Sequence, residues 1–304
     1  MPNNQAHDPR VATAIERVAQ AIGLSVAAVA SGNSYVAKTA LARQFSIDIN
    51  AVGGTVGASA VNASGRVGGK PAFNDTGNTF YDDSVTFAGD NVLRSDLTEG
   101  STGFGQLGGR VDFASHPDVN VAALQLGDEI WIATAVFFPA EWQFNVGRQK
   151  FLRLRIYAGG SSAGYLDLYL NSEMRITGDG SDESYHWINE GAPNWAYRGS
   201  SAQAVTRGVW RQIELYMCLD SVPADSGGDA EVRIWIDGSP LAPITNRATL
   251  PNSTATAEEF LLFGYYGNEG APVDQSLYFH SLRLSSAVPG NTDANGFPFL
   301  GIVS

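Results

Sequence analysis

Residues 149–157 read QKFLRLRIY, and this stretch decides the fold class. Positions 152, 154 and 156 are apolar, and each is followed by a polar or aromatic residue: Arg153, Arg155 and Tyr157. A period of two residues is typical of a strand that buries one side and turns the other side away from the core. The stretch therefore predicts a half-buried β-strand with two arginines and a tyrosine on its outer side.

Strand patterns of this kind recur over most of the chain. Alternation is clear at 165–170, 209–219, 231–236 and 277–284, residues 130–138 are apolar on both sides, and 260–266 form a further strand pattern. Asp237-Gly238 is a strong signal for a tight turn. No segment after residue 30 predicts a helix longer than two turns. Many short strands at this spacing are typical of a β-sandwich or barrel, so we expect an all-β domain.

Composition divides the chain into four parts. We expect a short helix or anchor at 1–34, an extended Gly/Ala-rich arm or linker at 35–74, a β-sandwich at 75–285 and a tail at 286–304. The first part has a narrow apolar stripe at helical spacing and no core of its own. The second part has one alternating run at 45–49 and otherwise mostly small residues, which cannot form an independent core. The Pro/Gly-rich tail is expected to pack on a surface.

Charge restricts the partners. The 304 residues include 19 Lys and Arg and 31 Asp and Glu, which gives a net charge of −12. Such a chain repels phosphate backbones, so we expect no nucleic-acid partner. An anionic polysaccharide would need a local basic patch. No apolar run reaches the ~20 residues of a membrane span, and the single cysteine, Cys218, allows no internal disulfide.

Five ordered blocks resemble the jelly-roll, concanavalin-like domain of polysaccharide lyases. They are GDEIWIATAVFFPAEW (127–142), QKFLRLRIY (149–157), GVWRQIELYMCLD (208–220), GDAEVRIWIDG (228–238) and LYFHSLRLSS (277–286). DPRVATAIERVAQAIG (8–23) is similar to the start of bacteriophage fibre and virion proteins. The resemblance implies a jelly-roll β-sandwich, preceded by a short helix and an extended arm, with a concave sheet that can hold a glycan.

A sugar-binding face is suggested by the residues opposite the core positions of these strands. If the strands are neighbours, one sheet face collects the residues opposite the core positions: Arg153, Arg155, Tyr157, Tyr165, Asp167, Tyr169, Gln212, Glu214, Tyr216, Arg233 and Trp235. Aromatic rings stack on the apolar faces of sugars, and arginine pairs with carboxylates in a bidentate way. The alternative interpretation is the ordinary solvated face of an antiparallel sheet.

A lyase that acts on uronate polymers must neutralise a carboxylate, remove a proton and protonate a leaving oxygen. Arg153, Arg155, His186 and Tyr216 supply suitable side-chain types and are the catalytic candidates. A structural role is the alternative for His186, because a lone histidine is more often structural than catalytic.

Metal and cofactor signals are weak. No His/Cys cluster predicts zinc, and we expect no metal and no cofactor. Residues 178–183 could wrap calcium through oxygen ligands, but they lack the EF-hand spacing, so a polar turn is preferred. The GSSAG run at 160–164 is followed by a strand pattern where a nucleophile elbow needs a helix, so it predicts a hairpin loop.

The main functional expectation is a phage virion structural protein: a fibre, decoration or appendage subunit whose jelly roll faces outward and binds surface glycan. Its partners would be other virion subunits, contacted through the N-terminal segment, and it would form a homo-oligomer, with a trimer as the first candidate. One alternative is a polysaccharide lyase that cleaves uronate polymers by β-elimination, and another is a bacterial glycan-binding module. The motifs lean toward a non-enzymatic role at a virion surface, with an extracellular location as the alternative.

Overall fold

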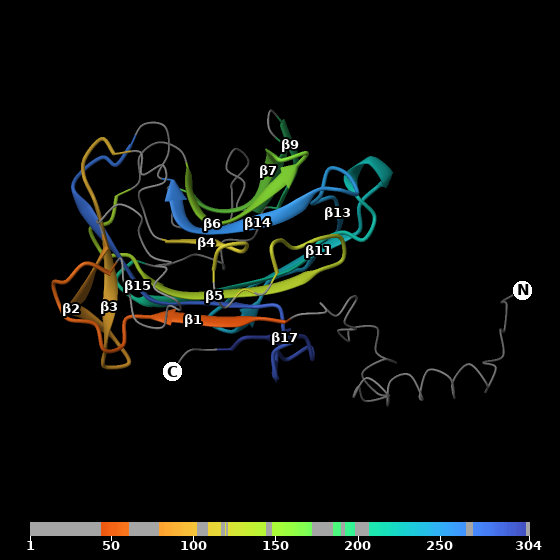
Figure 1. Cartoon of the computed structure of the whole chain (residues 1–304). Coiled ribbons are helices and arrows are strands. Elements are labelled where there is room, and N and C mark those ends of the chain that lie inside the picture. Colours follow the sequence, from red (N-terminus) through yellow and green to blue (C-terminus); the bar gives the residue numbers. More distant parts are fainter. Residues whose placement is uncertain are drawn as a thin grey trace, which may run out of the picture.

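The computed structural model describes residues 44–60, 79–101, 109–116, 119, 121–143, 148–171, 185–189, 192–197, 207–265 and 270–301. Two antiparallel sheets, A and B, pack face to face, and a small hairpin lies against the far side of sheet A (Figure 1). The described residues therefore form the predicted all-β sandwich.

Sheet A has nine strands. Its main order is β12 (Ser239–Pro240), β11 (Ala230–Ile236), β10 (Trp210–Cys218), β5 (Glu129–Phe137), β15 (Gln275–Ser285), β3 (Asp90–Leu97) and β2 (Thr79–Phe87). In addition, β1 (Ser46–Asn50) pairs with β15, and β13 (Ile244–Arg247) pairs with β11. A short 3-10 helix, η3 (Ala224–Ser226), lies between β10 and β11.

Sheet B has six strands. Their order is β4 (Gly109–Asp112), β14 (Thr256–Tyr265), β6 (Arg148–Ala158), β7 (Ser161–Asn171), β8 (Tyr185–Asn189) and β9 (Ala192–Tyr197). The third small sheet pairs β16 (Asn291–Thr292) with β17 (Pro298–Phe299).

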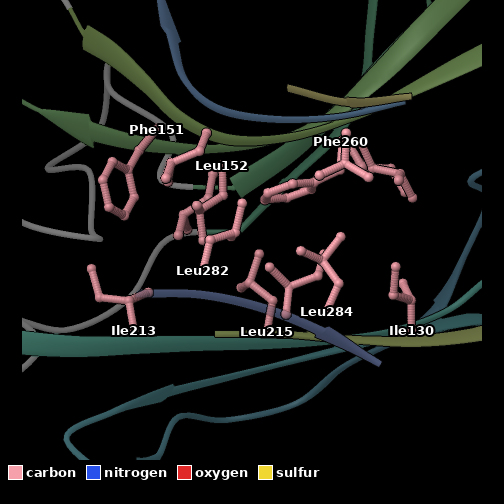
Figure 2. Close-up of a cluster of buried hydrophobic side chains, with 14 of the residues drawn as sticks. Ile130, Phe151, Leu152, Ile213, Leu215, Phe260, Leu282 and Leu284 are labelled. Carbon is pink, nitrogen blue, oxygen red and sulfur yellow. The ribbon is translucent and has the colours of Figure 1, made fainter. Parts of the chain in front are cut away.

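The predicted alternation places the core between the sheets. The apolar positions of β6, Leu152, Leu154 and Ile156, are fully buried in the main hydrophobic cluster. Figure 2 shows Leu152 in this cluster together with Ile213 and Leu215 of β10. Arg153 and Arg155, which alternate with the apolar positions of β6, therefore lie on the side of this strand away from the core. Burial of such side chains is the main favourable term that holds the two sheets together.

Tight turns connect neighbouring strands where the sequence supplies residues that accept positive φ. The β6–β7 turn uses Gly159 and Gly160, with φ of 60° and 77°. The β11–β12 turn uses Asp237 and Gly238, with φ of 50° and 75°. Two consecutive positive φ values match the twist of a hairpin, as expected for Asp-Gly. The GSSAG run contributes a turn glycine and the start of β7, which agrees with a hairpin.

The sandwich starts earlier than expected. Strand β1 pairs with β15 over its whole length, and Phe45, Ile47 and Ile49 are buried in the main core. The alternating run at 45–49 was predicted to be a strand, but in an arm outside the sandwich. It belongs to sheet A because its three large apolar side chains find burial only between the sheets.

The C-terminal tail forms a third layer, as expected of a segment that packs on a surface. Phe297 and Leu300 are buried in a second cluster on the outer side of sheet A. Trp131 Nε1 donates a hydrogen bond to the Pro298 carbonyl at 3.0 Å, and Trp235 Nε1 donates to Asp293 at 3.0 Å. Strand β5 is thus apolar on both sides because the tail covers its second side.

The predicted N-terminal helix at 1–34 lies outside the described residues, as do residues 35–43 and 61–74 of the expected arm and residues 75–78 at the start of the expected sandwich. Within the described ranges, no helix is long and apolar enough to cross a membrane. Cys218 is a buried free thiol at the end of β10.

Candidate functional site: the outer face of sheet B

The outer face of sheet B is concave. Figure 1 shows β6, β7 and β14 bending away from sheet A, so that the side turned away from the core lies inside the curve. We call this side the concave face. The described side chains that define it are Arg110 and Asp112 of β4, Glu259 of β14, Arg153, Arg155 and Tyr157 of β6, and Tyr165 of β7.

Arg153 and Arg155 both approach the ring of Tyr165. The guanidinium carbon of Arg153 lies 3.9 Å from the ring centroid, and that of Arg155 lies 5.8 Å from it. Arg153 is only 3 % exposed, whereas the Arg155 side chain is 32 % exposed. A cation over an aromatic face is held by the ring quadrupole. Arg153 therefore supports Tyr165 from within the sheet, and Arg155 is the arginine that a ligand can reach.

Glu259 connects β14 to β6 at one end of this face. Its carboxylate accepts a 2.7 Å hydrogen bond from the Tyr157 hydroxyl. The same carboxylate lies 3.6 Å from Arg155 Nη1 and 3.5 Å from Arg110 Nη2. Glu259 is 8 % exposed, which is acceptable for a carboxylate because two guanidinium groups and a hydroxyl surround it.

These contacts shift two ionisation equilibria. Burial, with the hydrogen bond to Glu259 as the next cause, raises the pKa of Tyr157 to about 12. Burial alone would lower the pKa of Arg155, but the nearby Tyr165, Tyr157 and Glu259 outweigh it and the pKa is raised. Tyr157 is thus a neutral donor and Arg155 a permanent cation at every physiological pH.

The strand register adds positions to the concave face beyond the described side chains. Asp167 of β7 is paired with Arg153 of β6 and with His186 of β8, so these three form one row across three strands. Tyr169 of β7 is paired with Lys150 of β6. The predicted site residues on β6 and β7, and His186 on β8, therefore belong to one sheet.

Comparison with solved structures identifies the fold. A variant of the alginate lyase Aly36B in complex with alginate trisaccharide matches with a TM-score of 0.50 and 17% sequence identity, over 79% of this chain and 97% of that one. The endo-β-1,4-glucuronan lyase from the fungus Trichoderma reesei matches with a TM-score of 0.49 and 13% identity, over 80% and 96%. The fold is the predicted jelly roll. No family model and no curated protein matches the chain.

The other predicted site residues do not join this face of the jelly roll. Gln212 and Tyr216 are on β10, and Arg233 and Trp235 are on β11, both in sheet A. The expected single face is therefore corrected to two faces on opposite sides of the molecule. Alternation fixes the side of its own sheet on which a residue lies, but it does not say which sheet the strand joins.

The C-terminal tail covers some of these sheet A residues and removes them from solvent. Tyr216 and Trp235 are each 1 % exposed, and both rings pack against Phe297, at centroid distances of 4.9 and 5.9 Å. The Tyr216 hydroxyl donates to Glu129 at 2.6 Å. The guanidinium of Arg233 lies 3.7 Å from the ring centroid of Phe297. These residues hold the tail in place, so Tyr216 does not reach the concave face as a catalytic candidate.

The sequence prediction did not select Glu259 or Arg110 as site residues. Tyr165 was expected on the sugar-binding face, but its position between two arginines could not be read from the alternation. Glu259 follows Glu258 within a strand, and the register is irregular between Ala257 and Glu259. Counting every second residue from Ala257 therefore does not predict on which side of the sheet Glu259 lies. Strand pairing alone brings it to Arg155.

Metal and partner expectations remain predictions. Within the described ranges, no group of three or more His, Cys, Asp or Glu residues is placed to hold a metal ion, and the calcium candidate at 178–183 lies outside them. The virion role, the homo-oligomer and the surface location depend on the N-terminal segment at 1–34, which is also outside the described ranges. The comparisons give the virion role no support.

Proposed function

We propose that the protein is a polysaccharide lyase that binds a uronate-containing polymer on the concave face and cleaves it by β-elimination. The observation that carries the proposal is the charge of β6. This strand, RQKFLRLRIYA, holds four of the 19 basic residues of the chain and no acidic residue. In a protein with a net charge of −12, such a strand at the centre of a concave sheet is the local basic patch that an acidic glycan needs.

The reaction assigns a role to each residue type. Arg155, the exposed arginine beside Tyr165, neutralises the carboxylate and so makes the proton on the adjacent carbon easier to remove. A base takes that proton, the bond to the glycosidic oxygen breaks, a carbon–carbon double bond forms, and an acid protonates the leaving oxygen.

Tyr165 and His186 are the candidates for proton transfer. Tyr165 lies between the two arginines, and His186 is paired with Asp167 in the row that contains Arg153. Tyr157 is unsuitable as a base because its hydroxyl already donates to Glu259 and its pKa is about 12. Arg153 acts through Tyr165 as a positioning residue.

An absorbance assay for unsaturated uronate products tests the proposal. The full chain is incubated with alginate, glucuronan, hyaluronan and other uronate polymers, and we expect a new ultraviolet band together with falling polymer size. If polymers bind but yield no unsaturated product, the lyase proposal is wrong and the protein is a glycan-binding protein. Loss of polymer size without the new band would indicate hydrolysis instead.

A further inference from the structure

Adjacent strands of the concave face carry opposite charge. Strand β6 holds four basic residues and no acidic one. The neighbouring β14 and β4 together hold three acidic residues, Asp112, Glu258 and Glu259, and one basic residue, Arg110. A ligand that crosses the sheet from β6 to β4 therefore passes from a positive strand to a region with a net charge of 1 − 3 = −2.

Glu259 lies at the boundary between the two regions. It faces Arg155 across the β6–β14 pairing and Asp112 across the β14–β4 pairing. The positive charges of Arg155 and Arg110 are partly compensated by the carboxylate of Glu259, at 3.6 and 3.5 Å. Because β14 and β4 hold no further basic residue, a second negative charge brought there from outside would meet no unpaired cation on these strands.

The raised pKa of Tyr157 shows that a negative charge is unfavourable next to Glu259. Its phenolate would form beside Glu259 and within reach of Glu258, and both carboxylates, after burial itself, raise its pKa. A carboxylate of a sugar over β14 would experience the same repulsion. Repulsion between two like charges a few ångströms apart in a partly buried site weakens ligand binding by about tenfold or more.

We propose that the sugar unit over β14 and β4 is neutral, so the preferred ligand alternates uronate residues with neutral sugars. This inference rests on the proposed binding of uronate polymers at the concave face. Neighbouring strands are about 4.8 Å apart, a distance comparable to one sugar unit. A chain running across the strands then places its carboxylate at Arg155 and the next sugar beside Glu259, where successive carboxylates would be repelled.

A binding comparison tests this without requiring cleavage. Glucuronan has a glucuronate at every position, and hyaluronan has one at every second position. Calorimetric titration with size-matched oligosaccharides of both should show hyaluronan bound about tenfold more tightly. Equal affinity, preference for glucuronan, or binding of neither would overturn the proposal. The lyase proposal fails separately, through the absence of unsaturated product.

Charge-removing variants locate the effect. Glu259→Gln keeps a hydrogen-bond acceptor for Tyr157, and Asp112→Asn is a second variant, on β4. Each variant should bind glucuronan more tightly and so reduce the preference for hyaluronan over glucuronan several-fold. Asp225→Asn in η3 removes an exposed carboxylate that is not on a strand of sheet B and should leave the preference unchanged. Circular dichroism confirms folding of each variant. A preference that persists in both sheet B variants would mean that these carboxylates do not set it.

Discussion

The hydroxyl of Tyr157 donates a 2.7 Å hydrogen bond to Glu259, and this bond joins the outer sides of β6 and β14. The bond connects β6, which carries four basic residues, to Glu259 of β14, a strand that together with β4 holds three acidic residues and one basic residue. The consequence is a phenol that stays protonated beside an arginine, Arg155, whose Nη1 lies 3.6 Å from the same carboxylate.

The Tyr157–Glu259 contact predicts an unusual titration. A phenolate absorbance titration, taken as the difference between the wild type and Tyr157→Phe, should show one tyrosine with a pKa of about 12. Glu259→Gln should bring that pKa part of the way back toward 10.0, because the charge is lost while burial remains. Asp225→Asn should have no effect. An unchanged value in Glu259→Gln would show that the carboxylate charge does not act on Tyr157.

Arg155 should dominate binding of acidic glycans. Arg155→Ala is expected to weaken binding and kcat/KM for a uronate polymer by about 100-fold, because a charge-assisted contact to the carboxylate is lost. Arg247→Ala, an exposed arginine on β13 of sheet A, is the matched control and should change both by less than about twofold. Similar losses in the two variants would indicate a non-specific charge effect.

Glu214 should make stability depend on pH. It lies 5 % exposed under the tail and accepts hydrogen bonds from the backbone N–H groups of Leu300 and Gly301. Burial, opposed by those bonds and by Arg283, raises its pKa from 4.5 to about 7. The folded state thus holds the proton more tightly, so the associated stability is complete below pH 4.5 and is lost as the pH rises through about 7.

The measurement is the free energy of unfolding from pH 4 to pH 8. At about 1.36 kcal/mol per pKa unit, the wild type should lose on the order of 3 kcal/mol relative to Glu214→Gln over this range. Glu141→Gln, which changes an exposed carboxylate, should run parallel to the wild type. If the free energy of unfolding of Glu214→Gln depends on pH in the same way as that of the wild type, another group causes the pH dependence.

The tail should contribute substantially to stability through Phe297. Its ring is 2 % exposed and packs against Tyr216 and Trp235. Phe297→Ala should lower the free energy of unfolding by about 3 kcal/mol and shift tryptophan fluorescence to the red as Trp235 becomes hydrated. Val288→Ala, at a position 45 % exposed, should stay within about 0.5 kcal/mol. Unchanged fluorescence would mean that the tail stays in place without this ring.

Much of the fold was predictable because strand patterns are local. The alternation in 151–157, the doubly apolar run at 130–138 and the Asp237-Gly238 turn each depend on a few neighbouring residues, and the structure contains all three. The side of β6 that carries Arg153 and Arg155 was predictable for the same reason. The β1 strand was assigned to the wrong part of the chain because its partner β15 lies more than 200 residues away.

Local sequence patterns were sufficient to predict the strands with clear alternation, the core-facing side of β6 and the concentration of positive charge on that strand. Which strands share a sheet depended on the three-dimensional packing. This packing placed Arg155 with Tyr165 and Glu259, and it placed Tyr216 and Trp235 under the tail on the opposite side. The reason is physical: a period of two residues records burial against some partner, whereas the identity of the partner depends on contacts between residues far apart in the chain.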